Sequence, residues 1–171
     1  MDRGGNAGPD ERLLAVTEWL LAAAVHPPQA RSQWETTGAA WLLPRKRFTA
    51  VTIPADRMGT AVVGAPPRER GAPLGHALEG LVFYQDRVYR RQGAYTVLLP
   101  GTAEQPWRVR GTTVHPPRAY LLVPAPDRTV PAGDGPWWVL PPQVPGRRCT
   151  PAALASLLSP SLGLNLGDVH A

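Results

Sequence analysis

Several features that would mark a particular class of protein are missing from this sequence of 171 residues. It has one cysteine, Cys149, so the chain can form neither an internal disulfide nor a zinc or iron–sulfur site built from several cysteines. No apolar run is long enough to cross a bilayer, and residues 1–12 lack the apolar stretch of a signal peptide. We therefore expect a cytoplasmic protein with no membrane partner.

The motifs of common enzyme classes are missing as well. There is no Gly-x-Ser-x-Gly sequence and no glycine-rich phosphate loop of the Walker or dinucleotide type. Cys149 follows two arginines and precedes a helix start, which favours a lowered thiol pKa, but no histidine lies near it in sequence to act as a base. The histidines show no metal-ligand spacing: His26, His76, His115 and His170. We expect no catalytic residue, metal or cofactor, although an enzyme using only Arg, Tyr and Asp groups would leave little trace in sequence.

Lysine is almost absent, because Lys46 is the one lysine among 18 basic residues. Abundant arginine, alanine, glycine and proline are typical of a GC-rich genome. The net charge of +5 is nevertheless concentrated in one segment of the chain. Residues 87–118 contain one acid, Glu104, and six arginines, which are Arg87, Arg90, Arg91, Arg108, Arg110 and Arg118. This segment therefore carries the whole net charge, which favours an anionic partner.

Proline and glycine are plentiful by contrast, with 21 and 17 residues spread along the chain without a period. Hydrophobic residues make up 43% of the sequence, which predicts a packed core of short elements joined by stiff turns. We expect one domain over residues 10–159, between a flexible N-terminus, residues 1–9, and a flexible tail, residues 160–171.

Helices are predicted at both ends of this domain. An apolar stripe at helical spacing predicts a helix over 10–25, which His26-Pro27-Pro28 ends because proline cannot continue the hydrogen-bond ladder. Thr150-Pro151 is a typical helix start and predicts a helix to about residue 158. Shorter helices are predicted at 56–63 and 74–79. Strands are predicted at 41–43, 48–53, 81–84 and 87–91 (joined by a turn at Gln85-Asp86), 94–99, 107–110, 120–123 (a central strand) and 137–140. The fold class is α+β, with a mainly antiparallel or mixed sheet of five to seven strands packed by the N- and C-terminal helices.

One stretch of sequence resembles a known family. An apolar strand ending in Leu99-Pro100-Gly101-Thr102 is followed by Val109-Arg110-Gly111, then by an apolar strand leading into Pro124-Ala125-Pro126, and then by Gly135-Pro136-Trp137-Trp138. This order resembles the C-terminal half of the primase–polymerase domain found at the N-terminus of bifunctional DNA primase/polymerases. The similarity covers residues 94–142 and extends more loosely over 34–158, so the resemblance implies a primase–polymerase-like fold.

The family's catalytic residues do not carry over to this sequence. Active members hold a divalent metal with an Asp-x-Asp pair and a later acid, and they bind the nucleotide with a histidine. This chain has no Asp-x-Asp, and Asp56 and Asp86 are isolated. Ala94-Tyr95 stands where the histidine would begin its strand, and Arg108 stands where the later acid would precede the Arg-Gly turn. The resemblance therefore implies a degenerate copy without polymerase chemistry.

Arginines on predicted strands form the candidate site. Side chains two or four positions apart on a strand share a face, and the guanidinium group suits phosphate oxygens. The candidate nucleic-acid or phosphate-binding residues are Arg87, Arg91, Arg108, Arg110, Arg45 and Arg47. Aromatic residues between them could stack on bases, and these are Tyr89, Tyr95 and Trp107.

Two functions fit this pattern. In the first, a non-catalytic primase–polymerase-like module binds nucleic acid or nucleotide phosphates through an arginine-rich sheet face. In the second, a protein-interaction or regulatory module uses the sheet, the proline-rich corners or an exposed Trp137-Trp138 pair. The arginines could also merely solubilise an exposed sheet face and protect an edge strand, while the aromatic residues fill the core.

Overall fold

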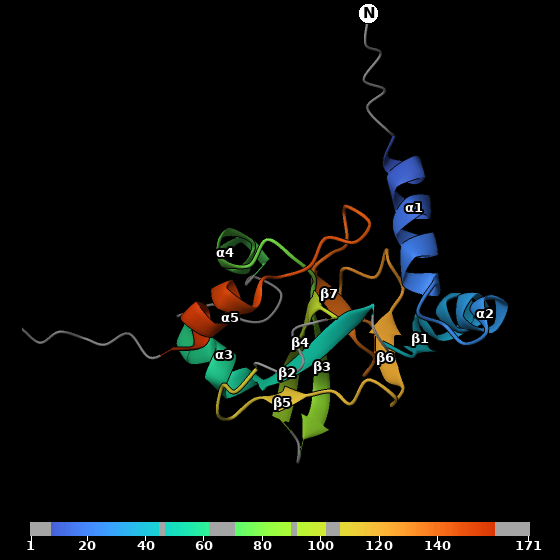
Figure 1. Cartoon of the computed structure of the whole chain (residues 1–171). Coiled ribbons are helices and arrows are strands. Elements are labelled where there is room, and N and C mark those ends of the chain that lie inside the picture. Colours follow the sequence, from blue (N-terminus) through green and yellow to red (C-terminus); the bar gives the residue numbers. More distant parts are fainter. Residues whose placement is uncertain (1–7, 45–46, 62–70, 90–91, 102–106, 160–171) are drawn as a thin grey trace, which may run out of the picture.

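An antiparallel sheet lies at the centre of this α+β protein, with other elements packed on both of its faces, as a computed structural model of the chain shows (Figure 1). The structure describes residues 8–44, 47–61, 71–89, 92–101 and 107–159. Its helices are α1 (Pro9–Leu21), α2 (Pro27–Thr37), α3 (Ala55–Ala61), α4 (Gly71–Ala77) and α5 (Pro151–Leu158). Its strands are β1 (Ala39–Leu42), β2 (Phe48–Pro54), β3 (Val82–Tyr89), β4 (Gln92–Pro100), β5 (Thr113–Val114), β6 (Leu121–Pro124) and β7 (Trp137–Leu140).

The central sheet has the strand order β5-β2-β4-β3-β7, and every neighbouring pair is antiparallel. Strands β1 and β6 form a separate antiparallel ribbon. Successive side chains of a strand point to opposite faces. On β4, Leu98 therefore packs into one core cluster, whereas Tyr95, Val97 and Leu99 pack into the other. The central strands are apolar on both faces because both faces are buried.

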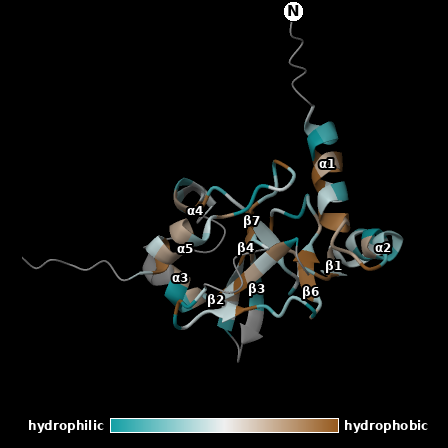
Figure 2. Cartoon of the chain, in the orientation of Figure 1, coloured by the Kyte–Doolittle hydropathy of each residue, from teal (hydrophilic) through white to brown (hydrophobic). Residues whose placement is uncertain are grey.

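The first core face is covered by α1, α2 and the β1–β6 ribbon. Apolar residues of these elements pack against Phe48, Phe83, Leu98 and Trp138 of the sheet. Trp138 is further fixed by a hydrogen bond of 3.0 Å from its indole nitrogen to the carbonyl oxygen of Ala125. Figure 2 shows hydrophobic residues along β6, in agreement with its packing on this face.

The second core face is covered by the three remaining helices, α3, α4 and α5 (Figure 1). Met58, Leu74 and Leu154 project from these helices into the core, and Leu78, directly after α4, joins them. Helix α5 begins where the sequence predicts it, because the Thr150 hydroxyl accepts a hydrogen bond of 3.2 Å from a backbone N–H in the first turn. None of the described helices is both long and apolar enough to span a membrane.

Three local predictions are wrong. Helix α1 ends at Leu21, and the His26-Pro27-Pro28 sequence, predicted to end a helix, instead begins α2. Proline is well suited to the first helical positions because the N–H groups there have no partner within the helix. Strand β3 is continuous through Gln85 and Asp86, where a turn is predicted, and an irregularity in its pairing with β4 follows Gln85.

The two other corrections concern strands after β4. Residues 107–110, predicted as a strand from their alternating pattern, form no regular element and lead into β5. The predicted central strand over 120–123 is β6, which pairs with β1 outside the main sheet. The apolar character of β6 instead comes from residues such as Leu121 and Val123, which face the core shared with α1 and α2.

Candidate functional site

Exposed arginines lie along the segment formed by residues 107–118. Arg108, Arg110 and Arg118 are exposed, and none of them forms an ion pair with a residue that the structure describes. This segment follows the outer edge of the sheet, where β5 pairs with β2 (Figure 1). We call it the arginine edge.

Pairing with β2 fixes the ends of the arginine edge. Thr113 lies opposite Thr52, so Arg110 lies beyond this pair, toward the end of β2 where α3 begins. Gly111 has φ of +74°, a left-handed conformation, and a Cβ atom there would lie 2.9 Å from Nη1 of Arg57. The guanidinium of Arg57, near the start of α3, is therefore close to the Arg110-Gly111 turn.

Of the remaining predicted arginines, Arg47 alone has a described side chain. Arg47 is exposed and precedes the first residue of β2, at the strand end opposite to Arg110, and the chain after β5 runs toward this end, because the N–H of His115 donates to the carbonyl of Ala50. Seven residues of strand separate these ends, which is about 20 Å at roughly 3.3 Å per residue. Arg45 and Arg91 lie outside the described residues. Arg87 and Tyr89 belong to β3 by their backbone, and their side chains also lie outside what is described.

The predicted arginine-rich sheet face is wrong for Arg108 and Arg110. Both residues project from an irregular segment rather than from a strand. The two faces of the central sheet are occupied by the two core clusters, so a ligand cannot lie across the strands. The described part of the arginine-rich surface is the sheet edge and the turns that continue it.

The predicted stacking residues do not form a platform. Tyr95 is fully buried and packs against Tyr84, with ring centroids 4.9 Å apart, so it fills the core instead of meeting a ligand. Trp107 is half-buried, and its indole nitrogen donates to the hydroxyl of Thr112 at 3.0 Å. An exposed tryptophan pair would favour a protein partner. This expectation is also wrong, because Trp137 and Trp138 are both buried.

Cys149 is not an activated nucleophile. Its side chain is buried, and burial raises the pKa of the thiol to about 12, although backbone hydrogen bonds at Gly80 and Leu81 act in the opposite direction. The expectation that the neighbouring arginines lower the pKa of the thiol is therefore wrong, because desolvation of the thiolate is the larger effect. Within the described residues, no group of three or more His, Cys, Asp or Glu side chains could hold a metal ion.

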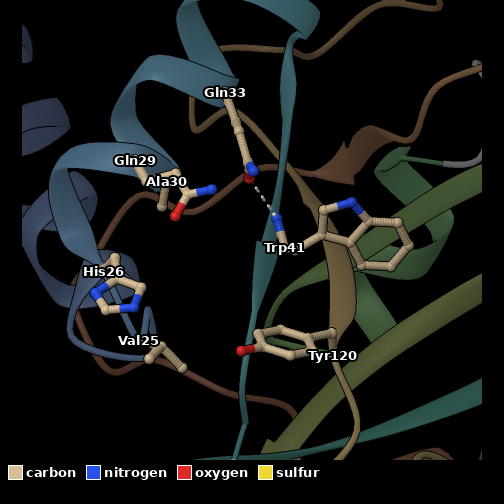
Figure 3. A pocket seen from close by; sticks show the side chains of 7 residues that line it. All are labelled: Val25, His26, Gln29, Ala30, Gln33, Trp41 and Tyr120. Carbon is tan, nitrogen blue, oxygen red and sulfur yellow. Dashed lines mark hydrogen bonds between the residues drawn. The ribbon is translucent and has the colours of Figure 1, made fainter.

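An aromatic pocket that the sequence analysis missed lies beside α2 (Figure 3). Trp41 of β1 pairs in register with Leu122 of β6, and Tyr120 precedes that residue by two positions, so the rings lie on the same side of the ribbon. The opposite side of the ribbon faces the core through residues such as Leu42 and Leu121. Because the ribbon covers a core with one face alone, Trp41 and Tyr120 are left 52% and 53% exposed.

The walls of the aromatic pocket combine apolar surface with a few polar groups, and no Asp, Glu, Lys or Arg is among the described lining residues. The pocket has a volume of about 470 Å³, and its described lining residues are Val25, His26, Gln29, Ala30, Gln33, Trp41 and Tyr120. Oε1 of Gln33 accepts a hydrogen bond of 3.0 Å from the backbone N–H of Trp41 (Figure 3). Trp41 lies in a predicted strand, but the second ring, Tyr120, comes from the residue before β6, a distant part of the sequence.

Comparison with known proteins gave no further guide to function. No protein-family model, curated protein or solved structure matches this chain.

Proposed function

We propose that this chain is a non-catalytic, primase–polymerase-like module that binds the phosphates of nucleic acid through the arginine edge. The observation that carries the proposal is the exposure of Arg108, Arg110 and Arg118 along one sheet edge, with no acidic partner among the described residues. The family resemblance, which covers residues 94–142, adds a reason to choose nucleic acid among anionic ligands.

The chemistry of the arginine edge suits a phosphate backbone. A guanidinium group offers several N–H donors in one plane, which match the oxygens of a phosphate. Arg108 and Arg110 precede β5, near α3, and Arg118 follows β5, before β6. The three residues therefore lie along a path rather than around a single cavity. A path of cations favours an extended polyanion over a small anion.

The test is a titration of a fluorescently labelled single-stranded oligonucleotide at 50 mM salt, followed by anisotropy. The double variant Arg108→Ala and Arg110→Ala removes two exposed contacts, each contributing about 1 kcal/mol. A total of about 2 kcal/mol corresponds to an affinity loss of about 30-fold. Both side chains are exposed, so the fold should be unchanged.

The matched control is the double variant Arg31→Ala and Arg147→Ala, which lowers the net charge by the same amount. These arginines are exposed and pair with Glu18 and Glu79, away from the arginine edge. The control should bind within about threefold of the wild type, since nonspecific charge effects on exposed sites are small. No binding by the wild type, or equal losses in the two double variants, would refute the proposal.

A protein partner is the second candidate, and helix α1 favours it. Residues 9–15 are all exposed, and they include Leu13 and Leu14, which are 39% and 58% exposed. This half of α1 extends away from the sheet and carries hydrophobic bands (Figures 1 and 2). If a second copy covers it, light scattering should give a dimer mass that Leu14→Glu reduces to the monomer mass. A monomer at all concentrations would exclude self-association through α1.

A further inference from the structure

We propose that the aromatic pocket receives one unpaired base of a single-stranded nucleic acid. The inference rests on the proposed function, because it adds a base-binding site to a chain whose arginine edge binds phosphates. Both the aromatic rings and the polar groups around them contribute to the argument.

The two rings offer stacking surfaces that no other ring occupies. Trp41 and Tyr120 are more than half exposed, and within the described residues neither contacts another aromatic ring. Keeping two large apolar rings in water has a free-energy cost that burial in the core would avoid. Stacking of a base on an aromatic ring is favourable and tolerates every base, because each base has a π-face.

The polar groups of the pocket match the edge of a neutral base. Within the described lining there is no Asp, Glu, Lys or Arg, and the hydrogen-bonding groups are amides, an imidazole and a phenol. Because Oε1 of Gln33 is used by the Trp41 N–H, the amide NH₂ group of Gln33 remains as a donor. The Gln29 amide extends into the space between α2 and the ribbon (Figure 3). Amide side chains both donate and accept, as base edges do.

The backbone phosphate of the nucleotide whose base is bound would find a cation nearby. Arg118 is exposed and lies two residues before Tyr120, in the turn that ends the arginine edge. The N-terminus of α2, which also borders the pocket, is a poor phosphate site because Pro27 and Pro28 have no N–H to donate. Along the chain, Arg118 therefore lies between the rest of the arginine edge and Tyr120 of the aromatic pocket.

A peptide is a poorer fit to the same pocket. An extended peptide would bind by adding a strand to the free edge of β1. The N–H of Trp41 on that edge is already bonded to the Gln33 side chain at 3.0 Å, so one of the hydrogen bonds that such a strand needs is occupied. A base requires no backbone partner, because its contacts are with side chains.

The experiment compares two labelled oligomers of equal length, a single-stranded oligonucleotide and an abasic oligomer with the same sugar-phosphate backbone. The wild type should bind the oligonucleotide about 5- to 150-fold more tightly than the abasic oligomer, the range expected for stacking of one base. Trp41→Ala and Tyr120→Ala should reduce this ratio toward one. The variant Arg108→Ala and Arg110→Ala should weaken both oligomers and leave the ratio unchanged. Val130→Ala, which truncates an exposed apolar residue between β6 and β7, should change neither value.

The outcomes separate this inference from the proposed function. Equal affinity of the wild type for both oligomers would overturn the base-binding site while leaving phosphate binding intact. Failure to bind either oligomer would overturn both. A polyproline peptide that binds and displaces the oligonucleotide, with the loss of its binding in Trp41→Ala, would assign the pocket to a peptide. Thermal unfolding of the two aromatic variants should match the wild type, because both rings are exposed.

Discussion

The buried thiol of Cys149 gives a prediction whose size follows from the structure. Burial raises its pKa from the ordinary value of 9.0 to about 12. At pH 8 an ordinary thiol is about one-tenth thiolate, whereas this one should be about one ten-thousandth thiolate. Because the thiolate is the reacting species, modification by Ellman's reagent should be about a thousandfold slower than for a small thiol. Urea should restore full reactivity, with one thiol per chain. Rapid modification of the folded protein would refute this reasoning.

The same shift makes a prediction about stability at alkaline pH. The folded-state pKa lies above the unfolded value, so the protonated thiol is favoured in the fold. This contribution is fully present below pH 9 and is lost as the pH rises from 9 toward 12. Between pH 8 and pH 10, the free energy of unfolding of the wild type should fall by about 1.4 kcal/mol more than that of a Cys149→Ala variant. Urea unfolding of both proteins at pH 8 and 10 measures this difference, and parallel curves would contradict it.

Three further predictions concern stability and can be measured by urea or thermal unfolding. Gly80→Ala should destabilise the fold by about 1–3 kcal/mol, since a Cβ there would collide with the backbone nitrogen of Cys149; a change below about 0.5 kcal/mol would contradict this close approach. Trp34→Phe should cost about 1–3 kcal/mol, because the indole N–H donates to the buried carbonyl of Val123 at 3.0 Å; unchanged stability would show that this carbonyl needs no partner. Thr150→Ala removes a helix cap and should cost about 1 kcal/mol, whereas Thr150→Ser should retain most of it.

The elements that the sequence predicts well are those with strong local signals. The Thr150-Pro151 start of α5 places a hydroxyl and a proline at positions where their helix-capping chemistry is specific. Strand β2 is bounded by Pro44 before it and Pro54 at its end, and its run of apolar and β-branched residues is typical of a buried strand. The α+β class follows from the order of such elements and needs no tertiary information.

The sequence misleads where a local pattern has two physical outcomes. His26-Pro27-Pro28 can end one helix or begin the next, because proline is excluded from helix interiors but favoured in the first turn. Strict alternation in residues 107–110 is typical of a strand, but this segment finds no partner over those residues. The Gln85-Asp86 pair has turn-forming polarity, but β3 continues through it, and Gln85 pairs with Ala94 of β4.

The sequence predicts only part of the candidate site. The sequence predicts Arg108 and Arg110 as site residues, and both are exposed in the structure, whereas Arg118 of the arginine edge is not among the predicted site residues. Their assignment to a sheet face required knowing that helices cover both faces, which is a tertiary property. The aromatic pocket depends on the pairing of β1 with β6, which brings Trp41 beside Tyr120 from a distant part of the chain. No local pattern specifies that pairing.

The salt dependence of oligonucleotide binding tests the central claim most directly. For single strands, the slope of log K against log salt is about −0.7 for each phosphate contact. If Arg108 and Arg110 each contact a phosphate, the slope for the double alanine variant should be smaller in magnitude by about 1.4 than for the wild type. Identical slopes, or a wild-type affinity that does not change with salt, would show that the arginine edge does not bind the phosphate backbone.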